Sequence, residues 1–127
     1  MAEFPEPMEG SVFYEDEVTY ACLAFHPIRD GHTIIVWKAD VEDLNDLSEE
    51  NHAHLMNVMY KVRKALLIAY GVPKVYVAYL DEALHVHIHL FPRKEGEEMG
   101  FGLMARPHGE LTDLSMVSIL RSFLPVS

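Results

Sequence analysis

The chain has 127 residues, half of them hydrophobic, and a formal net charge of −10. This length and composition predict one domain with a single core and exclude a disordered chain. The acidic balance argues against nucleic acid and anionic membranes as partners, and no apolar run is long enough to span a membrane. The single cysteine, Cys22, excludes an intrachain disulfide and a cysteine-rich zinc site. Because the acidic, proline-containing start lacks a signal-peptide pattern, we expect a cytoplasmic location.

The first part of the chain predicts a flexible start followed by a hairpin. We expect residues 1–10 to form a flexible N-terminal segment and residues 11–127 a single domain. Residues 18–25 and 33–38 are rich in β-branched and aromatic side chains, which favours two strands. The turn residues of 26–31 predict the loop that joins them as an antiparallel pair.

A long helix is expected next. Ser48 is a typical N-cap, and Glu49 and Glu50 place negative charge in the first turn, where it suits the helix dipole. Gly71 predicts the C-terminal end, and Pro73 cannot continue the helix. Apolar residues recur three and four positions apart and predict one buried stripe. Its members are Leu55, Met59, Val62, Leu66 and Ala69.

Two further strands and a short helix are expected in the remaining chain. Residues 75–80 and 85–91 have strand composition and a tight connection, which predicts a second hairpin. Residues 94–102 are charged and predict a loop. Thr112 predicts the cap of a short helix that ends near Phe123. Its inward residues are expected to be Leu114, Val117 or Met116, Leu120 and Phe123. The element order predicts an α+β fold, an antiparallel sheet with the long helix on one face.

Three histidines alternate with aliphatic residues in the last predicted strand. The segment reads His85-Val86-His87-Ile88-His89-Leu90-Phe91. Side chains of a strand alternate between faces, so the aliphatic set can pack on a core while the imidazoles project from the other face. The imidazoles then form a row with a spacing of about 6.5–7 Å. Because buried imidazole needs hydrogen-bond partners, the row indicates a functional site.

The chemistry of the row alone leaves three kinds of site open. Alternating histidines can bind a metal, act as acid, base or nucleophile, or donate hydrogen bonds to an anion such as phosphate. Three histidines within five residues disfavour the simpler explanation of a solvated strand face. A fourth candidate is His32 in Gly31-His32-Thr33, at the start of a predicted strand, where the glycine allows close backbone approach.

Together these residues resemble a known family. The triad segment matches the signature His-φ-His-φ-His-φ-φ, with φ apolar, of the histidine-triad (HIT) nucleotide-binding proteins. The similarity extends upstream to residues 14–17 as part of an N-terminal hairpin, to Gly31-His32-Thr33, and to residues 41–48 before the long helix. It covers about residues 12–93. It implies a HIT-like α+β fold and a homodimer that joins two sheets.

The resemblance also implies a reaction and roles for particular residues. Members of the family split phosphoramidates, dinucleoside polyphosphates or related bonds at the α-phosphorus through a nucleotidyl-histidine intermediate, with no metal or other cofactor. His87 would be the nucleophile, and the backbone carbonyl of His85 would fix its tautomer. His89 and His32 would contact the phosphate. Arg93, just past the triad, is a further candidate for substrate binding, with a solvated arginine as the alternative.

Two positions depart from the family pattern. Ala24 stands where an aspartate or asparagine usually grips the ribose hydroxyls, and Glu82 stands where many members have serine or threonine near the leaving group. The expected phosphate chemistry is therefore complete, whereas nucleoside and leaving-group recognition is altered. A nucleotide-binding regulatory protein with weak or no catalysis is the alternative function. The other histidines are expected on the surface: His26, His52, His54 and His108.

Overall fold

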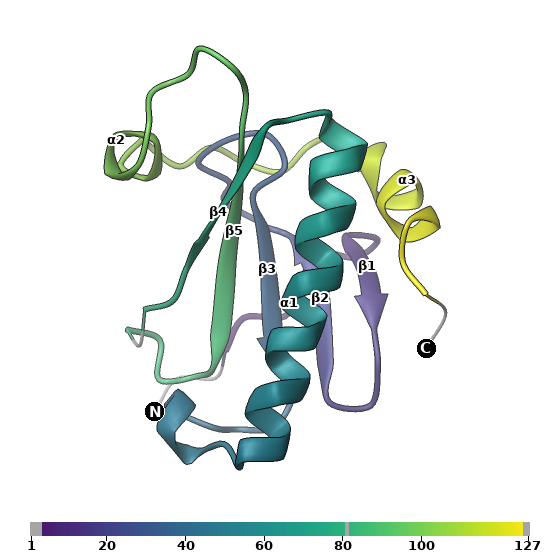
Figure 1. Cartoon of the computed structure of the whole chain (residues 1–127), viewed down its shortest axis with the longest axis vertical. Helices are drawn as coiled ribbons and strands as arrows, with labels where there is room; N and C mark the ends of the chain where they lie inside the picture. Colours follow the sequence, from purple (N-terminus) through teal and green to yellow (C-terminus); the bar gives the residue numbers. More distant parts are fainter. Residues whose placement is uncertain (1–3, 81, 126–127) are drawn as a thin grey trace.

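The computed structural model describes residues 4–80 and 82–125 as a five-stranded antiparallel sheet with one long helix on one face (Figure 1). Across the sheet the strands are β1 (Val12–Glu15), β2 (Thr19–Leu23), β3 (Thr33–Trp37), β5 (His87–Arg93) and β4 (Lys74–Ala78). The predicted α+β fold is therefore confirmed. Residues 1–3 of the predicted flexible segment and Asp81 of the predicted second connection lie outside the described residues.

The short strand β1 was not predicted as a separate element. It has four residues, and neighbours Phe13 and Tyr14 are both buried, so it lacks the alternation that marks a strand. The cause is an irregularity in its pairing with β2 between Val12 and Tyr14, where the register shifts by one residue. The tertiary sheet, rather than local periodicity, defines this edge strand.

Helix α1 (Glu49–Tyr70) has the predicted ends. The Ser48 side chain accepts a hydrogen bond from the Asn51 backbone N–H at 3.1 Å, and Gly71 ends the helix with a φ of 60°. The buried stripe is wider than predicted, because Val58 and Ala65 are buried as well as Leu55, Val62 and Leu66. Met59 and Ala69 lie at its margin and are partly buried.

The chain after β5 differs most from its predicted form. A short helix, α2 (Phe101–Met104), begins inside the predicted loop, and the C-terminal helix is α3 (Met116–Ser122). Thr112 does not cap α3, because a turn in which the Asp113 side chain accepts from the Ser115 N–H precedes it. Val117 and Leu120 are buried as predicted, whereas Phe123 is 48 % exposed and the prediction for it was wrong.

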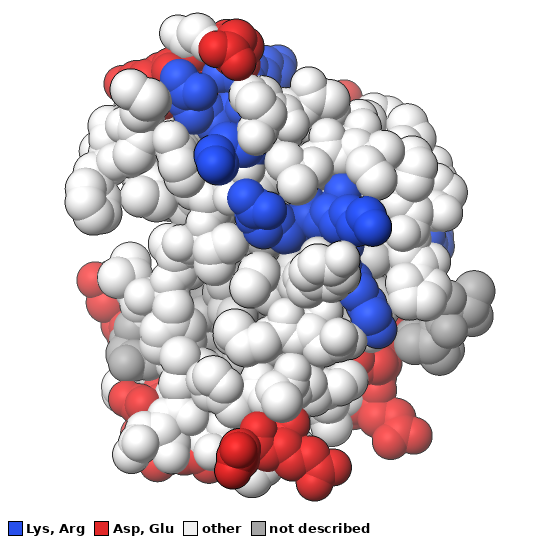
Figure 2. Space-filling model, viewed as in Figure 1, with Lys and Arg blue, Asp and Glu red and all other residues white. Residues whose placement is uncertain are grey.

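One face of the sheet packs on the hydrophobic core, and the other carries the histidines of the candidate site. Val86, Ile88 and Leu90 are buried against α1, which leaves the opposite face to the alternating histidines. On the helix side, acidic residues occupy the first turn of α1 and basic residues its later half. Figure 2 shows red at the bottom of this face and blue across its middle, with both colours together at the top. Within the described residues, no helix is long and apolar enough to cross a membrane.

Candidate active site

The histidine row occupies the start of β5. The strand begins at His87 rather than at His85, which corrects the predicted bounds. Backbone hydrogen bonds from Val86 to Val41 (2.8 Å) and from Trp37 to Val86 (3.1 Å) nevertheless hold the segment before β5 beside its neighbours. All three triad histidines therefore remain part of one site, although only two belong to the regular strand.

Hydrogen bonds to backbone carbonyls orient the first two histidines. Nδ1 of His87 lies 2.6 Å from the carbonyl oxygen of His85, and Nε2 of His85 lies 2.6 Å from the carbonyl oxygen of Trp37. A carbonyl oxygen only accepts, so each of these ring nitrogens carries the proton and donates. In neutral His87 the other nitrogen, Nε2, then holds a lone pair, which is the form that attacks an electrophile.

His32 and His89 form a second, directed pair. The backbone N–H of Ile28 donates to Nδ1 of His32 at 3.2 Å, so the proton of neutral His32 is on Nε2. That nitrogen lies 2.9 Å from Nδ1 of His89, which accepts the bond. Neutral His89 must then carry its own proton on Nε2. The pair therefore leaves one N–H donor on His89, whose ring centroid is 4.9 Å from that of His87.

Burial keeps this pair neutral. His32 is 3 % exposed, and desolvation, together with the nearby His89 and His108, lowers its pKa from 6.5 to about 3. Desolvation, with His87 and His108, lowers the pKa of His89 to about 4. Phe91 contributes to the apolar surroundings, since its ring centroid is 4.4 Å from that of His32. Both imidazoles are therefore uncharged near neutral pH and keep their directed hydrogen bond.

Gly31 has a left-handed backbone conformation. Its φ is +82°, which disfavours any residue with a side chain. A Cβ atom added there would lie 2.8 Å from Cγ of Pro92 and 2.9 Å from the Tyr70 ring. The predicted close backbone approach is confirmed, and it places His32 against the end of β5.

A cavity of about 470 Å³ opens beside the His32–His89 pair. Its floor consists of β2, β3 and the residues that follow β2, including Cys22 and the buried Ala24. Phe4–Met8 form the opposite wall, and the Phe4 ring centroid is 4.8 Å from that of His85 and 4.9 Å from that of His87. The part of the predicted flexible segment that is described thus covers the site; its flexibility stays a prediction.

Arg93 does not point to the histidines. Its guanidinium donates to the backbone carbonyl oxygens of Glu97 and, at 3.2 Å, of Glu98. In this structure Arg93 thus holds the chain after β5, and its predicted contact with substrate stays a prediction.

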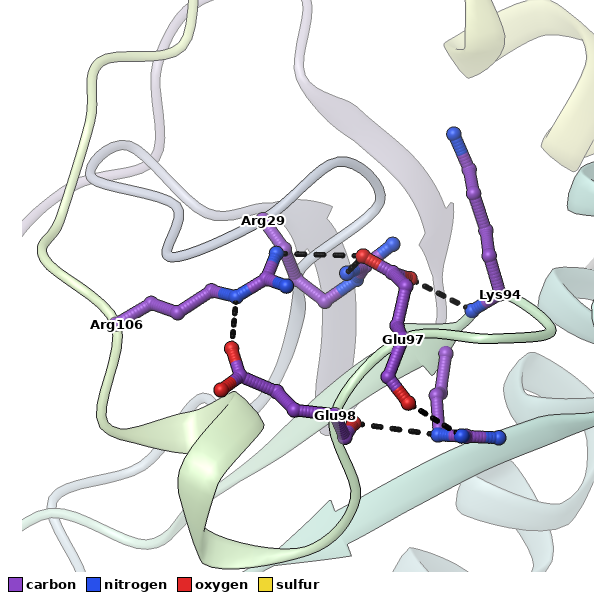
Figure 3. Close-up of polar contacts among 6 residues, drawn as sticks. Arg29, Lys94, Glu97, Glu98 and Arg106 are labelled. Atoms are coloured by element: carbon purple, nitrogen blue, oxygen red, sulfur yellow. Dashed lines mark hydrogen bonds and ion pairs between the residues drawn. The ribbon is translucent and has the colours of Figure 1, made fainter.

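An ion-pair cluster behind His32 is absent from the sequence-based predictions (Figure 3). The Arg29 side chain is 3 % exposed, and its guanidinium lies 2.7 Å from the Glu97 carboxylate. Arg106 binds Glu97 at 3.3 Å and Glu98 at 2.5 Å. The His32 N–H donates to the carbonyl of Arg29, so the cluster supports the backbone that carries His32. Arg29 and Glu97 are 68 positions apart, so no local sequence pattern predicts their ion pair.

The cluster predicts a specific loss of stability in acid. The hydrogen bond from Arg29 lowers the pKa of Glu97 from 4.5 to about 2, so its stabilisation is full above pH 4.5 and disappears as the pH falls toward 2. Glu97→Gln should lower the free energy of unfolding at pH 7 by about 1–2 kcal/mol and remove part of this acid dependence. Urea unfolding between pH 2.5 and 7 measures both effects. Glu95→Gln, at an exposed position, is the control; an unchanged pH dependence in Glu97→Gln contradicts the assignment.

The remaining sequence candidates divide into surface and site residues. Glu82 and His52 are exposed, and His54 binds Asp16 at 2.8 Å on the helix side. His26 and His108 are exposed as expected, but both also line the cavity beside His89. No group of three or more histidine, cysteine, aspartate or glutamate residues within 4–80 and 82–125 has an arrangement suited to a metal ion.

The comparison with protein families assigns this fold and site to a class. The family model described as the HIT domain matches residues 6–96, which is most of the chain. The chain therefore belongs to the histidine-triad (HIT) family, as the triad signature indicated.

Relatives and solved structures agree with the assignment. An uncharacterised HIT-like protein of Borreliella burgdorferi is 29% identical over 96 residues, 69% of each chain. An adenosine 5'-monophosphoramidase of Schizosaccharomyces pombe is 28% identical and covers 70% of this chain and 68% of its own length. A hypothetical histidine-triad nucleotide-binding protein from Sulfolobus tokodaii has the same fold, with a TM-score of 0.75 and 24% identity over 91% of this chain and 84% of its own.

Proposed function

We propose that this protein is a nucleotide hydrolase or nucleotidyl transferase that acts at the α-phosphorus. Its substrate would be a nucleoside phosphoramidate or a (di)nucleoside polyphosphate, and the intermediate would be nucleotidyl-His87. The observation that carries the proposal is the 2.6 Å hydrogen bond from His87 Nδ1 to the His85 carbonyl, which leaves Nε2 as a nucleophile beside the donor on His89.

In the first step Nε2 of His87 attacks the α-phosphorus, so a P–N bond forms as the bond from phosphorus to the leaving group breaks. The leaving group departs with the bonding electron pair and takes a proton from solvent. His89 donates from Nε2 to a non-bridging oxygen and stabilises its growing charge. The family resemblance implied that His32 contacts the phosphate. Because both of its ring nitrogens are engaged in this structure, we instead assign His32 the role of positioning His89.

In the second step water attacks the nucleotidyl-His87 intermediate. The new P–O bond forms as the P–N bond breaks, the water releases a proton to solvent, and His87 recovers its lone pair. The products are a nucleoside monophosphate and the protonated leaving group. An acceptor hydroxyl or phosphate in place of water gives nucleotidyl transfer.

The names of relatives support this class of substrate. One is called an adenosine 5'-monophosphoramidase. Another, of Schizosaccharomyces pombe, is called an asymmetrical bis(5'-nucleosyl)-tetraphosphatase, is 23% identical to this chain, and covers 85% of it and 65% of its own length. The chain spans about two thirds of the length of both relatives. Either leaving group, an amine or a phosphate, is compatible with the proposed first step.

A panel of substrates tests the proposal. Purified protein is incubated with adenosine and guanosine phosphoramidates and with dinucleoside tri- and tetraphosphates, and nucleoside monophosphate is quantified by chromatography. We expect monophosphate from at least one compound, with one equivalent of leaving group. Absence of product from every compound contradicts the proposed activity.

A nucleotide-binding protein with weak or no catalysis is the second candidate. Two observations favour it: Ala24 offers no polar group to a ribose, and His87 is only 6 % exposed beneath Phe4. Calorimetry that shows nucleoside monophosphate binding, combined with no turnover in the panel, would support this function. Turnover at ordinary enzyme rates excludes it.

We also propose a homodimer, and the expected cytoplasmic location stays a prediction. Strand β4 is an edge of the sheet; Val77 within it is 44 % exposed, and Leu80 just after it is 55 % exposed. An exposed apolar edge strand favours pairing with a second copy. Val77→Lys should convert a dimer to a monomer in light scattering, whereas Ile119→Lys, at a 43 % exposed position on α3, should not. A monomeric wild-type protein contradicts the proposal.

A further inference from the structure

His108 lies far along the chain from the triad but beside it in the structure. It lines the same cavity as Ala24, His32 and His89. The proximity also has an electrostatic consequence, since His108 contributes to the lowered pKa of both His32 and His89. The position is outside residues 6–96, the part of the chain that matches the HIT family model.

The loop that carries His108 is held against the residues after β2. The Gly109 N–H donates to the Pro27 carbonyl at 2.7 Å, and the Leu111 N–H donates to the Phe25 carbonyl at 2.9 Å. Nδ1 of His108 lies 2.8 Å from the His26 carbonyl oxygen, so Nδ1 carries a proton and donates. The other ring nitrogen, Nε2, is the one available to a ligand. Three hydrogen bonds thus fix both the loop and the orientation of the ring.

The cavity wall near Ala24 otherwise offers few polar groups. Leu23, Ala24 and Ile34 are apolar, and sugar hydroxyls placed against them would lose hydrogen bonds to water, at a cost of about 1–3 kcal/mol for each group left unsatisfied. Tyr20 also lines the cavity, but it is four residues earlier on the same extended chain, about 13 Å away. Of the other polar side chains that line the cavity, His32 and His89 are bonded to each other, and the His26 ring lies edge-on to Phe25. Glu6 belongs to the opposite wall, in the segment Phe4–Met8.

We propose that His108 is a specificity-determining residue that hydrogen-bonds the ribose hydroxyls of the nucleotide through Nε2, at the wall where Ala24 provides no polar group. The proposal rests on the nucleotide function proposed above. It assigns recognition of the ribose to a residue outside the part of the chain that matches the family model. A ribose hydroxyl both donates and accepts, so it fits an imidazole nitrogen in either protonation state.

The test compares two substrates that differ only in the sugar. Adenosine 5'-phosphoramidate and its 2',3'-dideoxy analogue are assayed with wild type, His108→Ala and His108→Gln. We expect His108→Ala to lower kcat/KM about tenfold for the ribose substrate, the loss of one hydrogen bond of about 1.4 kcal/mol, and to leave the dideoxy substrate unchanged. His108→Gln should recover part of the loss, because an amide both donates and accepts. His52→Ala, an exposed histidine on α1, is the control.

Other outcomes overturn the proposal in distinguishable ways. An equal fall for both substrates assigns His108 to the phosphate or to loop structure, and no fall for either removes it from the site. If wild type turns over neither substrate, the proposed activity fails separately, and calorimetry with AMP and 2',3'-dideoxy-AMP decides about His108. Equal ribose discrimination by wild type and His108→Ala, or no binding of AMP, then overturns the proposal.

Discussion

His87→Ala is expected to lower kcat by at least about 10⁴-fold on every substrate that the protein cleaves, because it removes the atom that forms the P–N bond. Rapid-quench kinetics with a nucleotide labelled at the α-phosphate provides the direct measurement. Wild type should accumulate label on protein after an alkaline quench, which preserves the P–N bond, and peptide mapping should place it on His87. The variant should carry no label.

His85→Ala is the matched control for this experiment. The bond that orients His87 comes from the backbone carbonyl of His85, which alanine retains, whereas the lost side-chain bond is to the Trp37 carbonyl. We expect a loss of about tenfold or less, typical of one hydrogen bond, with the protein label preserved. Thermal unfolding of both variants checks that each is folded. Activity that survives in folded His87→Ala contradicts the covalent mechanism.

His89→Ala is expected to have the second largest effect, a fall in kcat of about 10²–10³-fold, as when one donor to a developing oxyanion is removed. The Nε2–H of His89 is the donor that the hydrogen-bond chain from Ile28 through His32 leaves free. Ground-state binding of nucleoside monophosphate should change much less, because the donor acts mainly on charge that develops in the transition state. A variant that loses affinity and rate equally contradicts this assignment.

His32→Phe tests whether His32 positions His89, because this variant keeps His89 and removes its hydrogen-bond partner. Without the donor on His32, neutral His89 is free to carry its proton on Nδ1, and the donor toward the phosphate is then partly lost. We expect a fall in kcat of about tenfold or more, the effect of one misdirected hydrogen bond. NMR of protein with ¹⁵N-labelled histidine reports the tautomer directly: Nε2–H for His89 in wild type, and a mixture in His32→Phe. An Nδ1–H tautomer in the wild-type protein contradicts the assignment.

Local patterns in the sequence determined the long helix, the central strands and the strand that carries the histidines. Alternation places His87 and His89 on one face of β5 and Ile88 on the other, and this needs only the two-residue period of a strand. The cap at Ser48 and the left-handed end at Gly71 are equally local, since each depends on a few neighbouring residues. These features could therefore be predicted from the sequence.

Tertiary structure decided which distant groups lie around the histidines of β5. The directed bond between His32 and His89, the ion pair of Arg29 with Glu97, and the position of His108 beside Ala24 each join segments with no shared period. Loops bring these groups together, and loop contacts depend on how the whole sheet closes rather than on local pattern. The sequence by itself placed His87 and His89 on one face of the strand, and its resemblance to the HIT family predicted that His87 is the nucleophile. Only the fold decided the tautomer of His89. The backbone N–H of Ile28, far from the triad in sequence, fixes the proton of His32 on Nε2, and His32 in turn fixes the proton of His89.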